Sequence, residues 1–100
     1  MIRIRTSVTL HRIRCIVAIE GLNVKVGDLG GWIEKYENLS DNAWVDEKAE
    51  VYGDARVYGN ARVFDDAWVL NDAQVYGDAR ICGDARIHDN TRIYGNTVIT

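Results

Sequence analysis

Three hexapeptides decide the fold of this chain: ARVYGN at residues 55–60, AQVYGD at 73–78 and TRIYGN at 91–96. They are nearly identical and begin eighteen residues apart. Related hexapeptides fill the intervals, so the whole chain from residue 37 onward divides into units of six. A fixed period of this kind indicates a repeat architecture, in which each unit packs on its neighbours.

The positions within the hexapeptide have constant chemical character. The third is Val, Ile or Leu in every unit from Leu39 to Ile99, and the first is Ala from Ala43 to Ala85, then Thr. Residues two apart on a strand point to the same side, so positions one and three face a common core. A small residue beside a branched one suits a narrow, interlocked interior. Positions two and four vary and are expected to point outward.

Positions five and six are mostly Gly, Asp or Asn, which tolerate left-handed backbone and favour turns. A short strand followed by a tight corner every six residues must wind. Three sides close a triangular coil of about eighteen residues, which is the hexapeptide-repeat parallel β-helix. Its coils stack about 4.8 Å apart, so that units eighteen residues apart lie above one another. We therefore predict an all-β fold with a short β-helix of about three and a half coils over residues 37–100.

Residues 1–36 are predicted to be N-terminal β strands and a capping segment, within a single domain overall. Alternating apolar residues indicate two strands, with a hairpin through Thr6 and Ser7 as one possible connection. GDLGGWIE, at residues 27–34, has three glycines within five residues and predicts a turn. Because terminal repeats need atypical caps, we expect Trp32 to plug the end of the core. A ligand-stacking role is the alternative. The alternating residues are Ile2, Ile4, Val8, Leu10, Ile13, Cys15, Val17 and Ile19.

The segment VKVGDLGGWIEKYENLSDNAWV, residues 24–45, and the units after it resemble the left-handed hexapeptide-repeat proteins of bacteria and phages, often labelled transferases. The subgroup found in prophages has a lead-in similar to GDLGGWIE before units of the type ARVYGNA. The resemblance covers about residues 12–100. It implies a left-handed helix and a phage or prophage setting, and it implies no established activity.

Charge and composition limit the classes of partner that the chain is expected to bind. The net charge of −3 provides no strong field for a polyanion or for an acidic substrate. Residues 1–19 carry four arginines and no acid, so they either lie on the more acidic remainder or recruit nucleic acid. We favour the first reading. Those arginines are Arg3, Arg5, Arg12 and Arg14.

The expected location is the cytoplasm, or the host cytoplasm for a phage-encoded protein. No secretory pattern precedes residue 20, and no stretch has the length of a membrane span. Cys15 and Cys82 lack CxxC spacing and read as free thiols in a reducing compartment. We expect neither a membrane nor a nucleic acid as partner.

The resemblance to hexapeptide acyltransferases raises the question of a catalytic histidine. Those enzymes use a histidine as general base, and most insert a loop that shapes the acyl-donor site. Here His88 lies beside Asp89, but no insertion interrupts the units from Ala43 onward. We predict no catalytic residue and no cofactor, with a minimal acyltransferase that uses His88 in an oligomer as the alternative.

No metal site is expected. The zinc-binding branch of the fold needs three histidines, and only His11 and His88 are present. Two acidic pairs recur eighteen residues apart and read as corner formers rather than cation ligands. These pairs are Asp54 with Asp72 and Asp66 with Asp84.

The predicted binding residues lie on the side built from the three opening hexapeptides. Position four there holds Tyr58, Tyr76 and Tyr94, and position two holds Arg56, Gln74 and Arg92. Tyr and Arg are frequent in binding hot spots, although stacked tyrosines also stabilise a sheet face. Both readings stay open. We predict a non-catalytic protein-binding or assembly module, one form of which is an inhibitor of a host protein. The binding residues are Tyr58, Tyr76, Tyr94, Arg56 and Arg92.

Self-association is predicted at the C-terminal coil. The outward column that contains Arg62 and Arg80 continues to an apolar residue, Val98. We expect a homo-oligomer that associates through this coil, at Thr97, Val98 and Ile99, or through a face of the β-helix.

Overall fold

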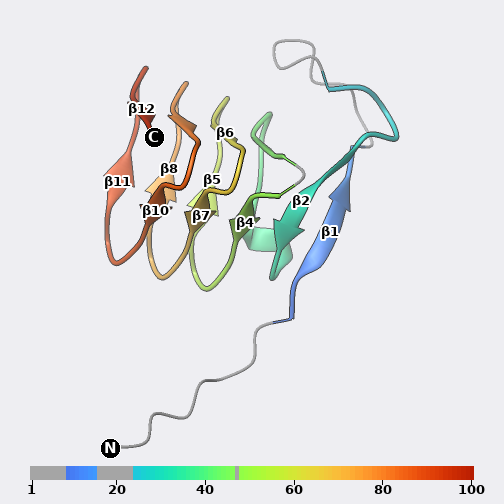
Figure 1. The fold of residues 1–100 in the computed structure, drawn as a ribbon, viewed down its shortest axis with the longest axis horizontal. Helices are drawn as coiled ribbons and strands as arrows, with labels where there is room; N and C mark the ends of the chain where they lie inside the picture. Colours follow the sequence, from blue (N-terminus) through green and yellow to red (C-terminus); the bar gives the residue numbers. More distant parts are fainter. Residues whose placement is uncertain (1–8, 16–23, 47) are drawn as a thin grey trace, which may run out of the picture.

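The computed structural model describes residues 9–15, 24–46 and 48–100. The chain winds into coils that stack along one axis, and a β-hairpin lies at their N-terminal end (Figure 1). The elements in chain order are β1 (His11–Arg14), β2 (Leu29–Ile33), the 3-10 helix η2 (Tyr36–Asn38), β3 (Trp44–Val45), β4 (Glu50–Val51), β5 (Arg56–Val57), β6 (Arg62–Val63), β7 (Trp68–Val69), β8 (Gln74–Val75), β9 (Arg80–Ile81), β10 (Arg86–Ile87), β11 (Arg92–Ile93) and β12 (Val98–Ile99).

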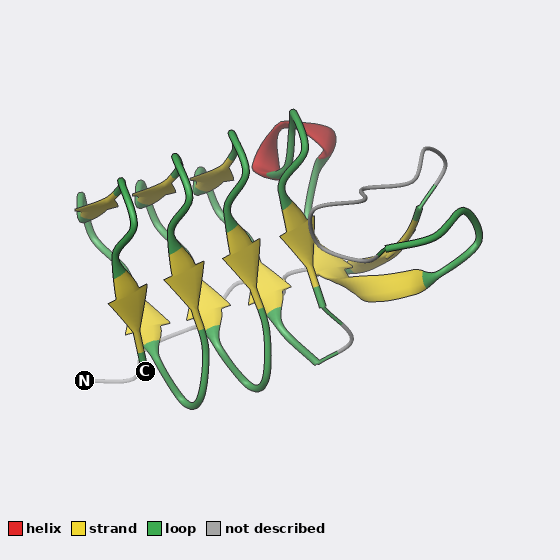
Figure 2. Ribbon diagram, turned by 90° about the horizontal axis from the view of Figure 1, so that it is seen from above, coloured by secondary structure: helices red, strands yellow, loops and turns green. Residues whose placement is uncertain are grey.

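Three parallel sheets form the three sides of the coil. Their strand orders are β2-β4-β7-β10, β5-β8-β11 and β3-β6-β9-β12, and β1 joins the first sheet antiparallel to β2. Each coil contributes one strand to each side, which Figure 2 shows as a row of stacked loops. The predicted short parallel β-helix is therefore confirmed, with about four turns.

The register confirms that units eighteen residues apart lie above one another. Gln74 of β8 lies opposite Arg56 on one side and opposite Arg92 on the other. Val57 likewise lies opposite Val75, so the inward column is aligned as well. The core consists of the position-one alanines and position-three branched residues, and those from Val45 to Ile81 have no exposed surface. On each side, one column of alanines and one column of branched residues fill the core, because the interior of the coil is narrow.

The corners depend on one left-handed residue each. Position five has φ between 57° and 67° wherever it is described from Asp41 onward. Position six does not share this conformation, although we predicted a corner role for Gly, Asp and Asn at both positions. Glycine adopts such backbone without strain, and Asp and Asn are the next best residues there. The non-glycine residues at position five are Asp41, Asp65, Asn71 and Asp89.

The β-helix begins one hexapeptide earlier than residue 37. Ile33 of β2 lies opposite Val51 and Trp32 lies opposite Glu50, in the register of every later pair of coils. Residues 31–36, GWIEKY, thus form a unit with Ile33 at the inward third position. The turn predicted for GDLGGWIE is wrong over Leu29–Ile33, which is a strand.

Trp32 does not plug the core, so that prediction is also wrong. As the position-two residue of its unit it points outward, where the Arg12 guanidinium lies 5.6 Å from the centre of its ring. The indole buried near this end is that of Trp44, which packs with Cys15 and Val24 and is 5% exposed. The hairpin strand β1 covers an outward position of the first coil, which makes Trp44 a buried exception in its column.

Two adjacent glycines let β2 approach the coil. A Cβ atom on Gly31 would lie 2.1 Å from the carbonyl oxygen of Asp46 and 2.4 Å from that of Ala49. A Cβ on Gly30 would lie 2.5 Å from the carbonyl oxygen of Val45. Backbone oxygens cannot move aside as a flexible side chain does. The glycines of GDLGGWIE therefore serve close packing at these two positions.

Asn38 of η2 is fully buried and fully hydrogen-bonded. Its Oδ1 accepts from the backbone N–H groups of Glu34 and Lys35, at 3.0 and 2.8 Å. Its Nδ2 donates to the carbonyl oxygens of Gly53 and Ala55, at 3.2 and 2.8 Å. One side chain thus ties η2 to the next coil. The hairpin predicted through Thr6 and Ser7 lies outside the described residues, and so do Ile2, Ile4, Val8, Val17 and Ile19.

Candidate protein-binding face

The three predicted tyrosines form one continuous stack along the β-helix axis. The ring centres of Tyr58 and Tyr76 are 4.9 Å apart, and those of Tyr76 and Tyr94 are 5.5 Å apart. The ring planes differ by only 5° and 17°, so the stack is straight. We call these three residues the tyrosine ladder. It runs beside β5, β8 and β11 because position four follows each strand at the same register.

Position two adds a polar column parallel to the tyrosine ladder. Arg56 and Arg92 are exposed, and Gln74 between them is half-buried. Gln74 Oε1 accepts a hydrogen bond of 3.2 Å from the hydroxyl group of Tyr58, which fixes the two columns to each other. The five predicted binding residues therefore lie on one side of the molecule. We call the tyrosine ladder and this column together the ladder face.

The ladder face differs in charge from the other two sides. Its outward positions from Ser40 through Tyr94 contain two arginines and no acid. The side of β2, β4, β7 and β10 carries Glu34 and Glu50, and the side of β3 carries Asp46. On a chain of net charge −3, this is a locally cationic and aromatic surface.

Stacking decides which part of each tyrosine is available to a partner. Both faces of the Tyr76 ring are covered by its neighbours, so only its edge and hydroxyl group are accessible. Recognition of bases by stacking needs an open aromatic face. The middle of the tyrosine ladder lacks one, but it offers apolar edges beside hydroxyl donors and guanidinium groups, a combination common at protein interfaces.

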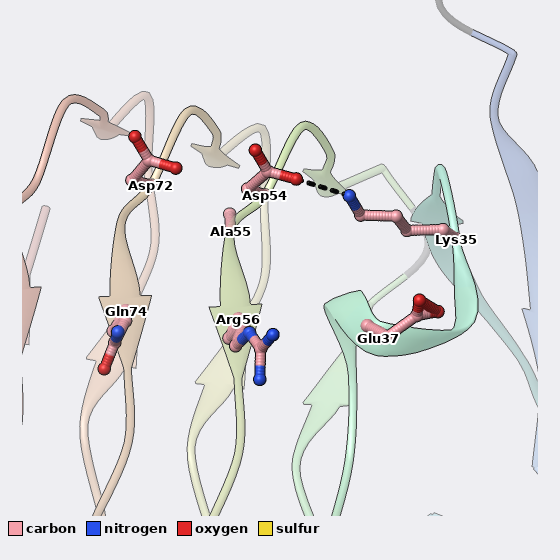
Figure 3. A pocket seen from close by; sticks show the side chains of 7 residues that line it. All are labelled: Lys35, Glu37, Asp54, Ala55, Arg56, Asp72 and Gln74. Carbon is pink, nitrogen blue, oxygen red and sulfur yellow. Dashed lines mark hydrogen bonds and ion pairs between the residues drawn. The ribbon is translucent and has the colours of Figure 1, made fainter.

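A shallow polar depression of about 350 Å³ adjoins the ladder face at its N-terminal corner (Figure 3). Arg56 and Gln74 belong to both the depression and the ladder face. Lys35 reaches from the N-terminal side toward Asp54, and its Nζ lies 2.5 Å from Asp54 Oδ1. The full lining is Lys35, Glu37, Asp54, Ala55, Arg56, Asp72 and Gln74.

The Lys35–Asp54 contact shifts the pKa of both side chains. The hydrogen bond and charge of Lys35 hold the pKa of Asp54 below its ordinary value of 3.8, and the bond to Asp54 raises the pKa of Lys35 above 10.5. Both side chains are well exposed, so the pair contributes little to stability. Lys35 offsets the negative charge of Asp54. The other two acids of the depression are Asp72 and Glu37.

On the other two sides, large outward-facing residues contact one another. The Arg86 guanidinium lies 4.1 Å from the centre of the Trp68 ring, against which Tyr52 packs edge-on. On the third side, Arg62 donates twice to Asp46 Oδ2 and lies over Phe64. These cations contact rings and acids of their own side, whereas Arg56 and Arg92 are exposed on the ladder face.

The two histidines lie far apart. His11 is on β1 and His88 follows β10, so they occupy opposite edges of one sheet, with β2, β4 and β7 between them. His88 is exposed, and its Nδ1 lies 3.1 Å from Asp89 Oδ2. Asp89 also occupies the left-handed corner position, which accounts for an acid there without a catalytic role.

The described part of the chain also bears on a metal site, a membrane-spanning helix and the two cysteines. No three or more His, Cys, Asp or Glu side chains come together there in a way that could hold a metal ion. No helix there has the length and apolar character needed to cross a membrane. Cys15 and Cys82 are both buried, and they form no disulfide bond with each other. Cys82 occupies position four of its hexapeptide, which was expected to point outward, but it is only 9% exposed.

The residues predicted for self-association are accessible. Val98 is 56% exposed and Ile99 is half-buried against the core. Thr97 is exposed, and its hydroxyl group donates to the carbonyl oxygen of Tyr94. Tyr94 is the most exposed member of the tyrosine ladder, at 59%.

Comparison with known proteins agrees with this geometry. A family model described as the YdcK β-solenoid repeat matches residues 49–63, 55–71, 73–89 and 79–95. These matches cover the regular coils that carry most of the ladder face. A search of the curated proteins and of the solved structures gave no significant match. Together with the stacked parallel sheets, the repeat match identifies the chain as a β-helix repeat protein.

Proposed function

We propose that the protein is a non-catalytic protein-binding module whose contact surface is the ladder face. The observation that carries this proposal is the straight stack of Tyr58, Tyr76 and Tyr94 beside the exposed Arg56 and Arg92. Tyr loses little conformational entropy relative to the contact that it makes, and Tyr and Arg are both enriched in binding hot spots. A rigid sheet face holds them in place before the partner arrives, which reduces the entropic cost of binding.

A protein partner fits this surface better than a nucleic acid or an acyl donor does. The inner tyrosine has no free ring face on which a base could stack. For acyl transfer, the hexapeptides around His88 carry no inserted loop that could shape an acyl-donor site. The minimal acyltransferase remains the alternative proposal, and acyl-donor binding measured by calorimetry would support it.

The test is capture of a partner from the native host, followed by mass spectrometry. The double variant Tyr76→Ala with Arg92→Ala should lose the partner while its circular dichroism spectrum and coil stability stay close to those of the wild type. A matched control, Leu70→Ala with Arg80→Ala, changes the two other sides and should retain it. If the ladder variant loses only thermal stability and still captures the same partner, the tyrosine ladder is structural.

Self-association through the C-terminal coil is the second proposal. The exposed Val98 and half-buried Ile99 offer an apolar surface that a second copy could cover. Light scattering on the 100-residue chain at micromolar concentration should then give a mass above 11.3 kDa, and Val98→Asp should reduce it to the monomer mass. A wild-type monomer mass would exclude this arrangement.

We further propose a phage or prophage setting with action in the cytoplasm of the host. This proposal depends on the resemblance of residues 24–45 to the GDLGGWIE lead-in, and inhibition of a host protein is one form that it takes. Expression in the host, followed by fractionation and co-purification of the bound protein, tests both location and target.

A further inference from the structure

The ladder face has a repeat distance that matches an α-helix. The centres of successive tyrosine rings, which belong to successive coils, lie 4.9 and 5.5 Å apart. An α-helix advances about 5.4 Å per turn, so its side chains recur at this spacing along one face. An extended strand repeats a face every 6.6 Å or so and would lose register within two coils.

The charges on the ladder face match a particular helix. Arg56 and Arg92 belong to coils two apart, a separation of about 10 Å along the stack. Seven residues of α-helix advance about 10.5 Å and return to nearly the same face. Acidic residues at positions i and i+7 of a helix could therefore each meet one arginine. The neutral Gln74 lies midway between the two arginines, so the helix needs no third charge on that column.

From these two relationships we infer that the ladder face binds an acidic amphipathic α-helix of the partner protein, laid along the β-helix axis. This inference rests on the proposed function and specifies the partner. Glu or Asp at i and i+7 contacts Arg56 and Arg92, while apolar residues at i+3 and i+4 lie against the ring edges of the tyrosine ladder. In this binding mode, the helix residues that contact the surface recur every three or four positions.

The depression beside Arg56 adds a preference at the edge of the helix. It contains Asp72 and Glu37 in addition to the compensated Asp54 (Figure 3). A Lys or Arg of the partner, located beside its acidic stripe, would reach these carboxylates. Opposite charges in adjacent stripes fix the side of the helix that faces the ladder, because the reversed arrangement would bring like charges together.

The probe is a pair of fluorescein-labelled synthetic peptides of about 20 residues, long enough to form a helix in water when rich in alanine. One carries Glu at i and i+7 with Leu at i+3 and i+4. The other has the same composition, but its second Glu is moved to i+5, on another face. Fluorescence anisotropy with the full chain should give at least a tenfold tighter Kd for the first peptide. Arg56→Glu with Arg92→Glu should abolish that difference and favour a peptide with Lys at i and i+7.

Equal affinity for the two glutamate peptides, or no binding of either, would overturn the helix inference. Comparable binding of an oligo-dT strand that the charge-reversed variant loses would also overturn it, because the surface would then recognise any polyanion. The proposed function has a separate outcome. If the peptides fail while capture of the host partner still depends on Tyr76 and Arg92, the binding face stands and only its helical ligand is wrong.

Discussion

Asn71 Oδ1 lies 3.1 Å from the backbone nitrogen of Asp89, which occupies the same corner one coil later. The same relationship joins Asp41 to Gly59 and Asp65 to Gly83, each at 3.0 Å. A non-glycine residue at position five has an unfavourable left-handed backbone, which costs about 1–2 kcal/mol. Its side chain offsets part of that cost by accepting an N–H group of the neighbouring corner. The alternative is glycine, which has no such cost.

Asn71→Ala should therefore destabilise the protein by about 1 kcal/mol or slightly more, because alanine keeps the unfavourable backbone and loses the acceptor. Asn71→Gly should change the stability by close to zero, because the lost hydrogen bond, about 1 kcal/mol, is offset by relief of the left-handed backbone cost. Urea unfolding followed by circular dichroism measures both. If the two variants are equally stable, the left-handed conformation carries no energetic penalty at this corner.

Gly31→Ala should be more harmful than an alanine at a glycine with a positive φ but open surroundings. The added Cβ would lie 2.1 Å from the Asp46 carbonyl oxygen, so β2 must move away from the coil. We expect a loss of about 3 kcal/mol, the upper part of the usual range for overpacking. Gly95→Ala is the matched control, because nothing lies within 4 Å of its Cβ and only its φ of 65° is strained. Thermal unfolding should rank Gly31→Ala below Gly95→Ala.

Asn38 offers a test that depends on pH. Asn38→Ala leaves two N–H groups and two carbonyl oxygens without their partner, for a loss of about 3 kcal/mol or more. Asn38→Asp keeps the acceptor but directs a buried carboxyl group at the carbonyl oxygens of Gly53 and Ala55. Burial and those oxygens should raise the pKa of that carboxyl group in the folded state above its unfolded value of about 3.9.

The sign of the pH effect follows from proton linkage. The folded Asn38→Asp variant retains a proton that its unfolded form releases above about pH 4, so its stability falls as the pH rises through that region. Relative to the wild type, Asn38→Asp should be less destabilised at pH 4.5 than at pH 7. Urea midpoints at the two pH values measure this difference. A constant gap would mean that water or a rearranged η2 solvates the carboxyl group.

The regular coils could be predicted because every level of the sequence agrees. The period of six fixes the corners, the alternation of small and branched residues fixes the inward columns, and the closer similarity at eighteen fixes the register. The tyrosine ladder followed from the same register. Its parallel ring stacking and the absence of acid from its side were consequences of register that the sequence already contained, once the three sides were separated.

The N-terminal end could not be predicted from the period because its residues depart from it. Gly31 replaces the position-one alanine of its unit, and Lys35 replaces the position-five glycine with an extended backbone of φ −147°. These departures hide GWIEKY as a repeat, although Ile33 at position three is a signal that could have identified it. Asn38, Lys35 and Trp44 gain their roles from contacts with distant segments, which local patterns do not encode.

The contact between Lys35 and Asp54 supports a final prediction at the edge of the ladder face. The pKa of Asp54 lies below 3.8 because Lys35 favours its charged form, so the small stability from this group is present above that pH and is lost as the pH falls through its folded pKa. Lys35→Met should return the pKa of Asp54 toward 3.8 with almost no change in unfolding midpoint, because exposed pairs contribute little. Carboxyl-carbon NMR titration measures the shift, and 0.5 M salt should reproduce part of it in the wild type by screening. Lys48→Met, which removes an exposed lysine on another corner, should leave the titration of Asp54 unchanged. An Asp54 pKa that does not respond to Lys35→Met would show that the two side chains are separated in solution.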